Sequence, residues 1–292
     1  MEKILDKDQI KSLIHLLEDD DEETYKLIFP QLIDMGEDLI PYILDAKERS
    51  INPILTSRLK EVYIELNLQT SIKELTDWKL HNSRNLYQGL TILAKYRYPN
   101  IDLRKVSEVI NKIRQDLWLE INDNLTALEK VRIINNIFFD IYKFRGDTKD
   151  YYAPENSFIN DILIRKKGNP LNLSAIYSII AQSVNIPIYG VNLPKNYMLV
   201  YVEKLYSQPL DNFQANDILF YINPFNRGEI HSKNDIINYL RRINIPVEEQ
   251  YYMPCSNIVT LSRSLNNLVK IYKNKGEENK IYGFKKLLEV LS

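Results

Sequence analysis

The sequence predicts an α+β protein: a helical N-terminal stack, a core with a small antiparallel sheet packed on a central helix, and a helical C-terminal tail. Three observations lead to this fold class. Apolar residues recur with helical spacing through most of residues 8–144, the period changes to two between residues 186 and 222, and helical spacing returns from residue 233. These changes predict three regions, 1–100, 101–250 and 251–292.

The N-terminal region, 1–100, reads as a series of short amphipathic helices joined by tight turns. Helical spacing is expected over residues 10–17, 25–35, 39–44, 54–66, 71–81 and 86–98. Helices of this length, connected in this way, are typical of an antiparallel, HEAT-like stack. No fixed repeat length is visible, so the repeat character rests on the helix lengths alone.

The second region changes in character after Gly146. Two long helices, 102–121 and 126–144, lead into a short one from 156 to 165 and a strongly apolar one from 173 to 184. The last carries small residues that allow another backbone to approach closely, so it is predicted to be central. Strands are expected at 186–193, 197–202 and 218–222, in an antiparallel meander. Helices at 233–242, 256–275 and 278–291 complete the chain.

Composition narrows the classes of function. The 292 residues are 45% hydrophobic and 26% charged, as in ordinary globular proteins. Lys and Arg number 38 against 39 Asp and Glu, so the basic excess of proteins that grip nucleic acid is absent, and nucleic acid is not the partner we expect. No apolar run is long enough to span a membrane, no signal peptide is recognisable, and Cys255 is the one cysteine. These features predict a cytoplasmic protein.

The sequence points to no cofactor and no metal. Eight glycines form none of the phosphate-binding motifs, and His15, His81 and His231 are scattered. Three histidines and one cysteine supply too few ligands for the usual zinc site without several carboxylates.

Four segments between Asn156 and Gly228 form a recognisable combination. They are Asn156-Ser157, Lys167-Gly168-Asn169-Pro170-Leu171, Gly190-Val191-Asn192-Leu193-Pro194 and Tyr221-Ile222-Asn223-Pro224-Phe225-Asn226-Arg227-Gly228. Together they resemble the SirB-like branch of the transglutaminase-like superfamily. The helices after residue 251 look like the tetratricopeptide-like tail that follows this core, so the resemblance covers most of 78–292.

The resemblance implies a papain/transglutaminase-like core with a nucleophile at the start of the buried helix, a histidine on the adjoining strand and an acid or amide on the next. This chain has no cysteine near Pro170. Asn196 stands where the family usually has histidine, and Asn223 where the superfamily usually has aspartate. An asparagine amide cannot accept a proton at neutral pH, so the triad is predicted to be degenerate, with no catalytic residue. The expected vestigial cleft holds Asn172, Ser174, Asn196 and Asn223.

Two functions from different classes follow. The first is a non-catalytic module that binds a protein or peptide; the second is a cysteine-independent hydrolase or acyl transferase that uses Ser174. A Cys255–His231 pair is a further arrangement to examine, and a contiguous basic face would favour nucleic acid. Asn196 and Asn223 can also serve only the backbone of their turns, as asparagine often does. The sequence predicts no oligomeric state.

Overall fold

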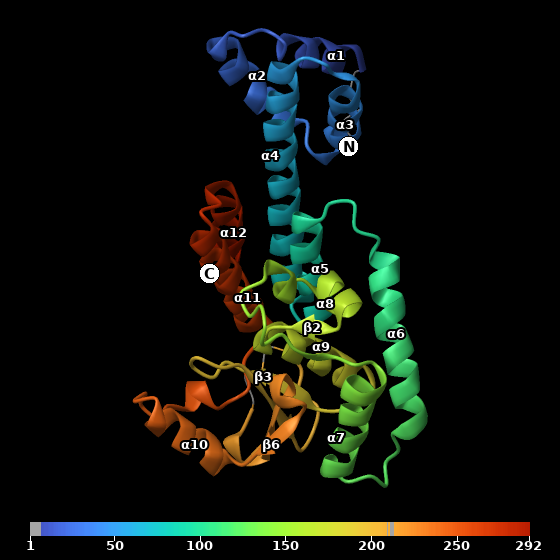
Figure 1. Ribbon diagram of the computed structural model, residues 1–292, viewed down its shortest axis with the longest axis vertical. Helices are drawn as coiled ribbons and strands as arrows, with labels where there is room; N and C mark the ends of the chain where they lie inside the picture. The colour runs from blue at the N-terminus through green and yellow to red at the C-terminus, as the bar shows by residue number, and fades with distance from the viewer. Residues whose placement is uncertain (1–6, 209, 211–212) are drawn as a thin grey trace. The chain divides into compact units, whose positions relative to one another are not determined.

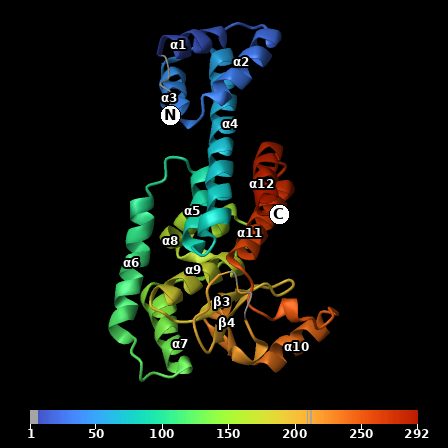
Figure 2. The same ribbon diagram turned by 180° about the vertical axis from the view of Figure 1, so that it is seen from behind.

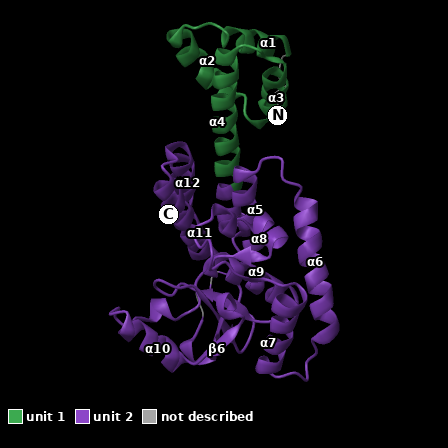
Figure 3. Cartoon of the chain, in the orientation of Figure 1, with its two compact units in different colours: residues 1–74 green, residues 75–292 purple. Residues whose placement is uncertain are grey.

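The computed structural model describes residues 7–208, 210 and 213–292 (Figure 1). The chain divides into two compact units, residues 1–74 and 75–292 (Figure 3). Residues 75–100 and 251–292 therefore belong to the same unit as residues 101–250. The division into regions 1–100, 101–250 and 251–292 stays a prediction from the sequence.

The first unit contains α1 (Lys7–Leu16), α2 (Glu22–Asp34), a 3₁₀ turn (Glu37–Leu39), α3 (Ile40–Arg49) and most of α4 (Pro53–Asp77). Asp21 caps α2, because its carboxylate accepts hydrogen bonds from the amides of Glu23 and Thr24 at 3.2 and 3.0 Å. One apolar stripe from each helix meets in a common core, which includes Ile10, Leu17, Leu32, Ile43 and Leu59. α1, α2 and α3 lie where the periodicity predicts helices, whereas the HEAT-like relationship stays a prediction.

α4 corrects the prediction of separate helices at 54–66 and 71–81. It runs without a break over 25 residues and continues into a π-helical turn, Trp78–Asn82. Ser71 does not begin a helix: its hydroxyl donates to the carbonyl of Asn67 at 2.8 Å, one turn earlier in the same helix. No glycine or proline interrupts residues 54–77, so nothing stops the helix there.

The second unit is built around α9 (Pro170–Ser183). The lead-in helices are α5 (Leu86–Arg97), α6 (Leu103–Glu120), α7 (Ala127–Asn135), which ends in a π-helical turn (Asn136–Ile141), and α8 (Ile159–Arg165) after a 3₁₀ turn (Pro154–Ser157). α9 contacts α5, α6, α8 and α11 as well as strands β3 and β4. It is buried almost all round, which confirms the prediction that this helix is central.

The sheet is a four-stranded antiparallel meander in the order β3 (Ile188–Val191), β4 (Met198–Val202), β5 (Ile218–Asn223), β6 (Glu229–His231). Its first two strands, β3 and β4, are labelled in the view from behind (Figure 2). The register places Gly190 opposite Leu199 and Val200 opposite Tyr221. The meander is as predicted, but β6 is an addition. The outer edge of β3 is covered, because the amide of Cys255 donates to the carbonyl of Gly190 at 2.8 Å.

A second, two-residue parallel pair, β1 (Arg145–Gly146) and β2 (Lys167–Gly168), also lies outside the prediction. Two residues are too few to show alternation in a sequence, so only the structure reveals this pairing.

The tail follows a short 3₁₀ turn (Glu249–Tyr251) and consists of α11 (Asn257–Lys275) and α12 (Glu278–Leu291), preceded in the chain by α10 (Lys233–Arg242). α11 ends at Gly276, which takes the left-handed backbone with φ 69°. α11 and α12 pack against each other, and α11 also contacts α9 and α5. None of the helices that the structure describes is long and apolar enough to cross a bilayer.

Candidate functional site

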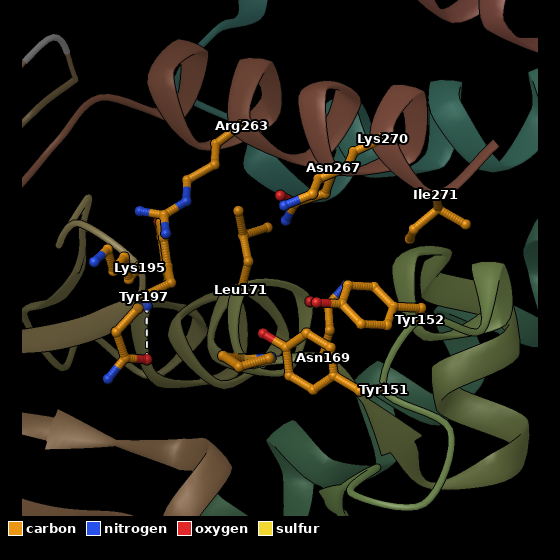
Figure 4. Close-up of a pocket in the computed structure, with 12 residues that line it drawn as sticks. Tyr151, Tyr152, Asn169, Leu171, Lys195, Tyr197, Arg263, Asn267, Lys270 and Ile271 are labelled. Atoms are coloured by element: carbon orange, nitrogen blue, oxygen red, sulfur yellow. Dashed lines mark hydrogen bonds between the residues drawn. The ribbon is translucent and has the colours of Figure 1, made fainter. Parts of the chain in front are cut away.

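Two hollows flank the turn between β3 and β4, and Asn196 lines both. The first, here the α9 hollow, has a volume of about 320 Å³ and lies between that turn, the start of α9 and one face of α11 (Figure 4). Its walls are Tyr151, Tyr152, residues 169–171, residues 195–197, Arg263, Asn267, Lys270 and Ile271. The second, here the β6 hollow, has a volume of about 450 Å³ and lies between the turn, the end of β5, β6 and α10.

The start of α9 is fixed by its own cap. Asn169 is buried, and its side-chain oxygen accepts a hydrogen bond from the amide of Asn172 at 2.8 Å. Its side-chain nitrogen donates to the hydroxyl of Ser157 at 3.0 Å. Pro170 occupies the first helical position, where a missing N–H costs nothing. The sequence Lys167–Leu171 therefore places a rigid helix N-terminus at the wall of the α9 hollow.

The β3–β4 turn carries Asn196 at its tip. Lys195 takes the left-handed backbone, with φ 59°, and the side-chain oxygen of Asn196 accepts a hydrogen bond from the amide of Tyr197 at 2.8 Å. The amide of Asn196 donates to the carbonyl of Leu193 at 3.1 Å. Asn196 therefore serves the turn backbone, and the same side chain borders both hollows.

Arg263 ties α11 to this turn. Its Nη1 donates to the side-chain oxygen of Asn192 at 2.5 Å and to the carbonyl of Leu193 at 2.8 Å, and its guanidinium lies 5.6 Å from the centre of the Tyr197 ring. Burial lowers the pKa of Arg263. Sequence reasoning missed this residue. The available signal was the spacing of Arg263, Asn267, Lys270 and Ile271, which puts four side chains on one helix face.

Tyr197 is the buried support of the turn. Its hydroxyl lies 2.7 Å from the hydroxyl of Thr260 on α11, and burial raises its pKa well above the usual range. A Cβ at Gly190 would meet this hydroxyl at 1.9 Å, so the glycine is required by the close approach of the ring. The wall of the α9 hollow is thus held by contacts that join β3, the β3–β4 turn and α11.

The β6 hollow brings Asn196 and Asn223 together, as the order of the strands predicts. His231 and Asp235 line it too. The side-chain oxygen of Asn223 is buried without a hydrogen-bond partner among the described residues, and so is Nε2 of His231, which lies 3.6 Å from a carboxylate oxygen of Glu229. Asp235 is engaged, because its carboxylate caps α10 by accepting from the amide of Ser232 at 2.7 Å.

Asn172 and Ser174 lie elsewhere. Both are buried in α9, and neither lines the α9 hollow or the β6 hollow. Asn172 accepts a hydrogen bond from the hydroxyl of Ser264 at 3.2 Å, which joins α9 to α11. The hydroxyl of Ser174 has no hydrogen-bond partner in the described part of the chain. Of the four residues expected in one cleft, the structure brings two together.

Cys255 and His231 do not meet. The Cys255 sulfur lies 3.6 Å from the Thr260 hydroxyl and 3.8 Å from the Tyr197 hydroxyl, whereas His231 lies in the β6 hollow. Burial raises the pKa of the Cys255 thiol, although hydrogen bonds to Thr260 and Tyr197 act in the opposite direction. A thiol that stays protonated is a poor nucleophile. Within residues 7–208, 210 and 213–292, no three His, Cys, Asp or Glu side chains gather in a way that could hold a metal.

Comparison with known proteins identifies the family to which this chain belongs. The model of the transglutaminase-like superfamily matches residues 104–266, which is more than half of the chain. This chain belongs to the transglutaminase-like superfamily. The matched segment contains α9, the whole sheet, the β3–β4 turn and Arg263.

Relatives of this transglutaminase-like chain come from bacteria and animals. A UPF0162 protein of Xylella fastidiosa is 24% identical over 189 residues, which are 63% of each chain. F-box only protein 21 of Pongo abelii is 29% identical over 225 residues, covering 77% of this chain and 31% of that protein, and its Homo sapiens counterpart is 29% identical over 143 residues. The chain thus spans less than two thirds of the length of these relatives. No solved structure matches it.

Proposed function

We propose that this chain is a non-catalytic, SirB-like member of the transglutaminase-like superfamily that binds a protein or peptide through the α9 hollow. The observation that carries the proposal is the set of side chains at the triad positions. The first turn of α9 offers Pro170, Leu171 and Asn172, the β3–β4 turn holds Asn196, and the end of β5 holds Asn223. None of these side chains can exchange a proton at neutral pH.

Acyl transfer needs a nucleophile and a base within hydrogen-bond reach of each other. Asn196 is occupied with its own turn, and Asn223 is an amide whose buried oxygen can only accept. An amide oxygen at either place can orient a ligand by accepting a hydrogen bond. It cannot activate that ligand for reaction, because it does not take up a proton at neutral pH. This chemistry favours recognition over turnover.

The alternative, a cysteine-independent hydrolase or acyl transferase that uses Ser174, lacks support in the site. The Ser174 hydroxyl is fully buried, and no group of the described residues lies within hydrogen-bond distance to take its proton. A substrate in either hollow would also have to reach past the walls, because Ser174 lines neither.

The α9 hollow has the character of a recognition site. Tyr151 and Tyr152 stand at its edge with 42% and 55% of their surface exposed, and Figure 4 shows their hydroxyl ends pointing into the hollow. Tyrosine offers a large apolar face together with a hydrogen-bonding tip, which suits the binding of peptides. The tetratricopeptide-like character that we assign to α11 and α12, and the HEAT-like character of the first unit, would supply further protein-binding surfaces. We place the protein in the cytoplasm.

Filling the hollow tests this proposal. Peptides are selected from a random phage-displayed library on the full chain, and their affinity is measured by fluorescence polarisation. Asn267→Trp places an indole in the hollow, so we expect it to weaken binding at least about tenfold, the equivalent of about 1.4 kcal/mol. The matched control is Asn266→Trp, because Asn266 is the exposed neighbour of Asn267 and does not line the hollow. Equal affinities for the two variants, or a selection that yields no saturable binder, would overturn the proposal.

Chemical labelling tests the hydrolase alternative separately. We expect a fluorophosphonate probe to leave Ser174 unlabelled and Ser174→Ala to hydrolyse p-nitrophenyl acetate at the background rate of the unaltered chain. Removal of an unpartnered buried hydroxyl should leave the free energy of unfolding within about 1 kcal/mol of its original value. Stoichiometric labelling at Ser174, with hydrolysis lost in a correctly folded Ser174→Ala protein, would establish the enzyme instead.

A further inference from the structure

We infer that the α9 hollow takes an anionic group of its peptide ligand, a carboxylate or a phosphate, between Arg263, Lys195 and Lys270. The inference rests on the proposed function and specifies its ligand. The three cations come from two places: Lys195 from the β3–β4 turn, and Arg263 and Lys270 from the inner face of α11 (Figure 4).

The charge of the hollow is one-sided. Its lining contains three cations and no aspartate or glutamate, although the whole chain has 38 Lys and Arg and 39 Asp and Glu. Some other arginines of the described residues do pair with a carboxylate, as Arg165 does with Asp147 at 3.1 Å. Arg263, Lys195 and Lys270 form no ion pair with any residue that the structure describes. A concave surface that carries one sign of charge attracts ligands of the opposite sign.

Arg263 is the group that we expect to contribute most to anion binding, because its side chain is half-buried and its charge has lost part of its hydration. Its hydrogen bonds go to neutral acceptors, the side-chain oxygen of Asn192 and the carbonyl of Leu193, and both use Nη1. The pKa of Arg263 is lowered chiefly by burial, which means that its charge has lost hydration without gaining a carboxylate. An arriving anion would supply the missing partner and could accept from the remaining guanidinium donors.

The other walls favour the same ligand. The N-terminus of α9 adds partial positive charge, and because Asn169 already caps the amide of Asn172, this contribution is a field rather than a set of free donors. Burial raises the pKa of Tyr151, so its hydroxyl stays protonated at neutral pH and can donate to an anion. A hollow of about 320 Å³ suits a single anionic group with its neighbours, whereas single-stranded nucleic acid needs an extended basic track.

Titrations followed by NMR test the inference on the full, isotope-labelled chain. The probes are acetyl-Glu-amide, its neutral isostere acetyl-Gln-amide, acetyl-phosphoserine-amide and inorganic phosphate. We expect saturable shifts of the Leu171, Lys195 and Asn267 amides with the anionic probes and none with the glutamine probe. The stronger of the glutamate and phosphoserine responses identifies which source of the anion the hollow prefers. Saturable shifts with inorganic phosphate alone would show that the hollow binds the anion without any peptide group attached to it.

Charge removal gives the matched comparison. Lys270 and Lys195 are both exposed, so Lys270→Gln is expected to weaken each anionic probe about two- to fivefold, as for an exposed ion pair. Lys195→Gln should have the same effect. Lys273→Gln, an exposed residue of α11 outside the hollow, should change nothing. If the glutamate and glutamine probes behave alike, or if Lys270→Gln and Lys273→Gln are indistinguishable, the inference is overturned.

The outcomes separate the two proposals. Selected peptides that lose affinity with Asn267→Trp but not with Lys270→Gln would leave the proposed function standing and reject the anion. Anionic probes that saturate on a chain with no peptide ligand would support the anion site and reject the peptide-binding function.

Discussion

Replacement of Gly190 by alanine is expected to lower the free energy of unfolding by about 3 kcal/mol, the upper part of the range for overpacked cores. A Cβ at this position lies 1.9 Å from the Tyr197 hydroxyl and 2.8 Å from its Cζ. The ring cannot swing away, because it is almost fully buried and its hydroxyl is held 2.7 Å from that of Thr260. Urea unfolding followed by circular dichroism measures the loss.

Two comparisons identify the cause of that loss. Gly168→Ala places a Cβ 3.3 Å from a terminal methyl group of Ile162, so a flexible side chain can yield and the cost should be about 1 kcal/mol or less. Tyr197→Phe removes the closest atom, so the Gly190→Ala/Tyr197→Phe protein should be more stable than the sum of the single changes predicts. A Gly190→Ala protein as stable as the original would contradict the packing described here.

Replacement of Arg165 by methionine is the second large effect, with an expected loss of about 3 kcal/mol. Asp147 is 2% exposed, and Arg165 lies 3.1 Å from its carboxylate. The same arginine donates to the side-chain oxygen of Asn156 at 3.3 Å. Without Arg165 the Asp147 charge stays buried and unpaired, which destabilises the folded state alone. Urea unfolding at neutral pH is the measurement.

Arg104→Met is the matched control, since Arg104 also pairs with a carboxylate but its side chain is 89% exposed. Little change is expected there, because water replaces the lost partner. Asp147→Asn combined with Arg165→Met should recover part of the stability by removing both charges. Equal losses for the Arg104 and Arg165 variants would show that burial is not the cause.

Much of the fold could be predicted because its signals are local. Ser232 and Asp235 form a capping box that marks the start of α10, and Gly276 marks the end of α11. The break near Ser71 was predicted wrongly because a serine inside a helix and a serine at its start look alike in sequence. β6 was missed because a strand of three residues is too short to show alternation.

The site was harder to predict, for two physical reasons. The meeting of Asn196 and Asn223 follows from strand order, so it could be anticipated. The depth of Ser174 could not, because α9 is apolar on nearly every face and its periodicity does not say which side meets a hollow. Arg263 lies far along the chain from the turn that it supports, and only tertiary packing brings the two together.

The covering of β3 by Pro254 and Cys255 limits how a partner can approach. Val191 pairs with Pro254, and the Cys255 amide occupies the Gly190 carbonyl, so the chain supplies its own cap along the edge beside the α9 hollow. An incoming segment therefore cannot dock by extending the sheet at that edge, which is the usual route of β-augmentation. The same cap shields the strand from edge-to-edge association with other copies, the starting point of aggregation. Recognition at this edge is left to side chains rather than to backbone hydrogen bonds.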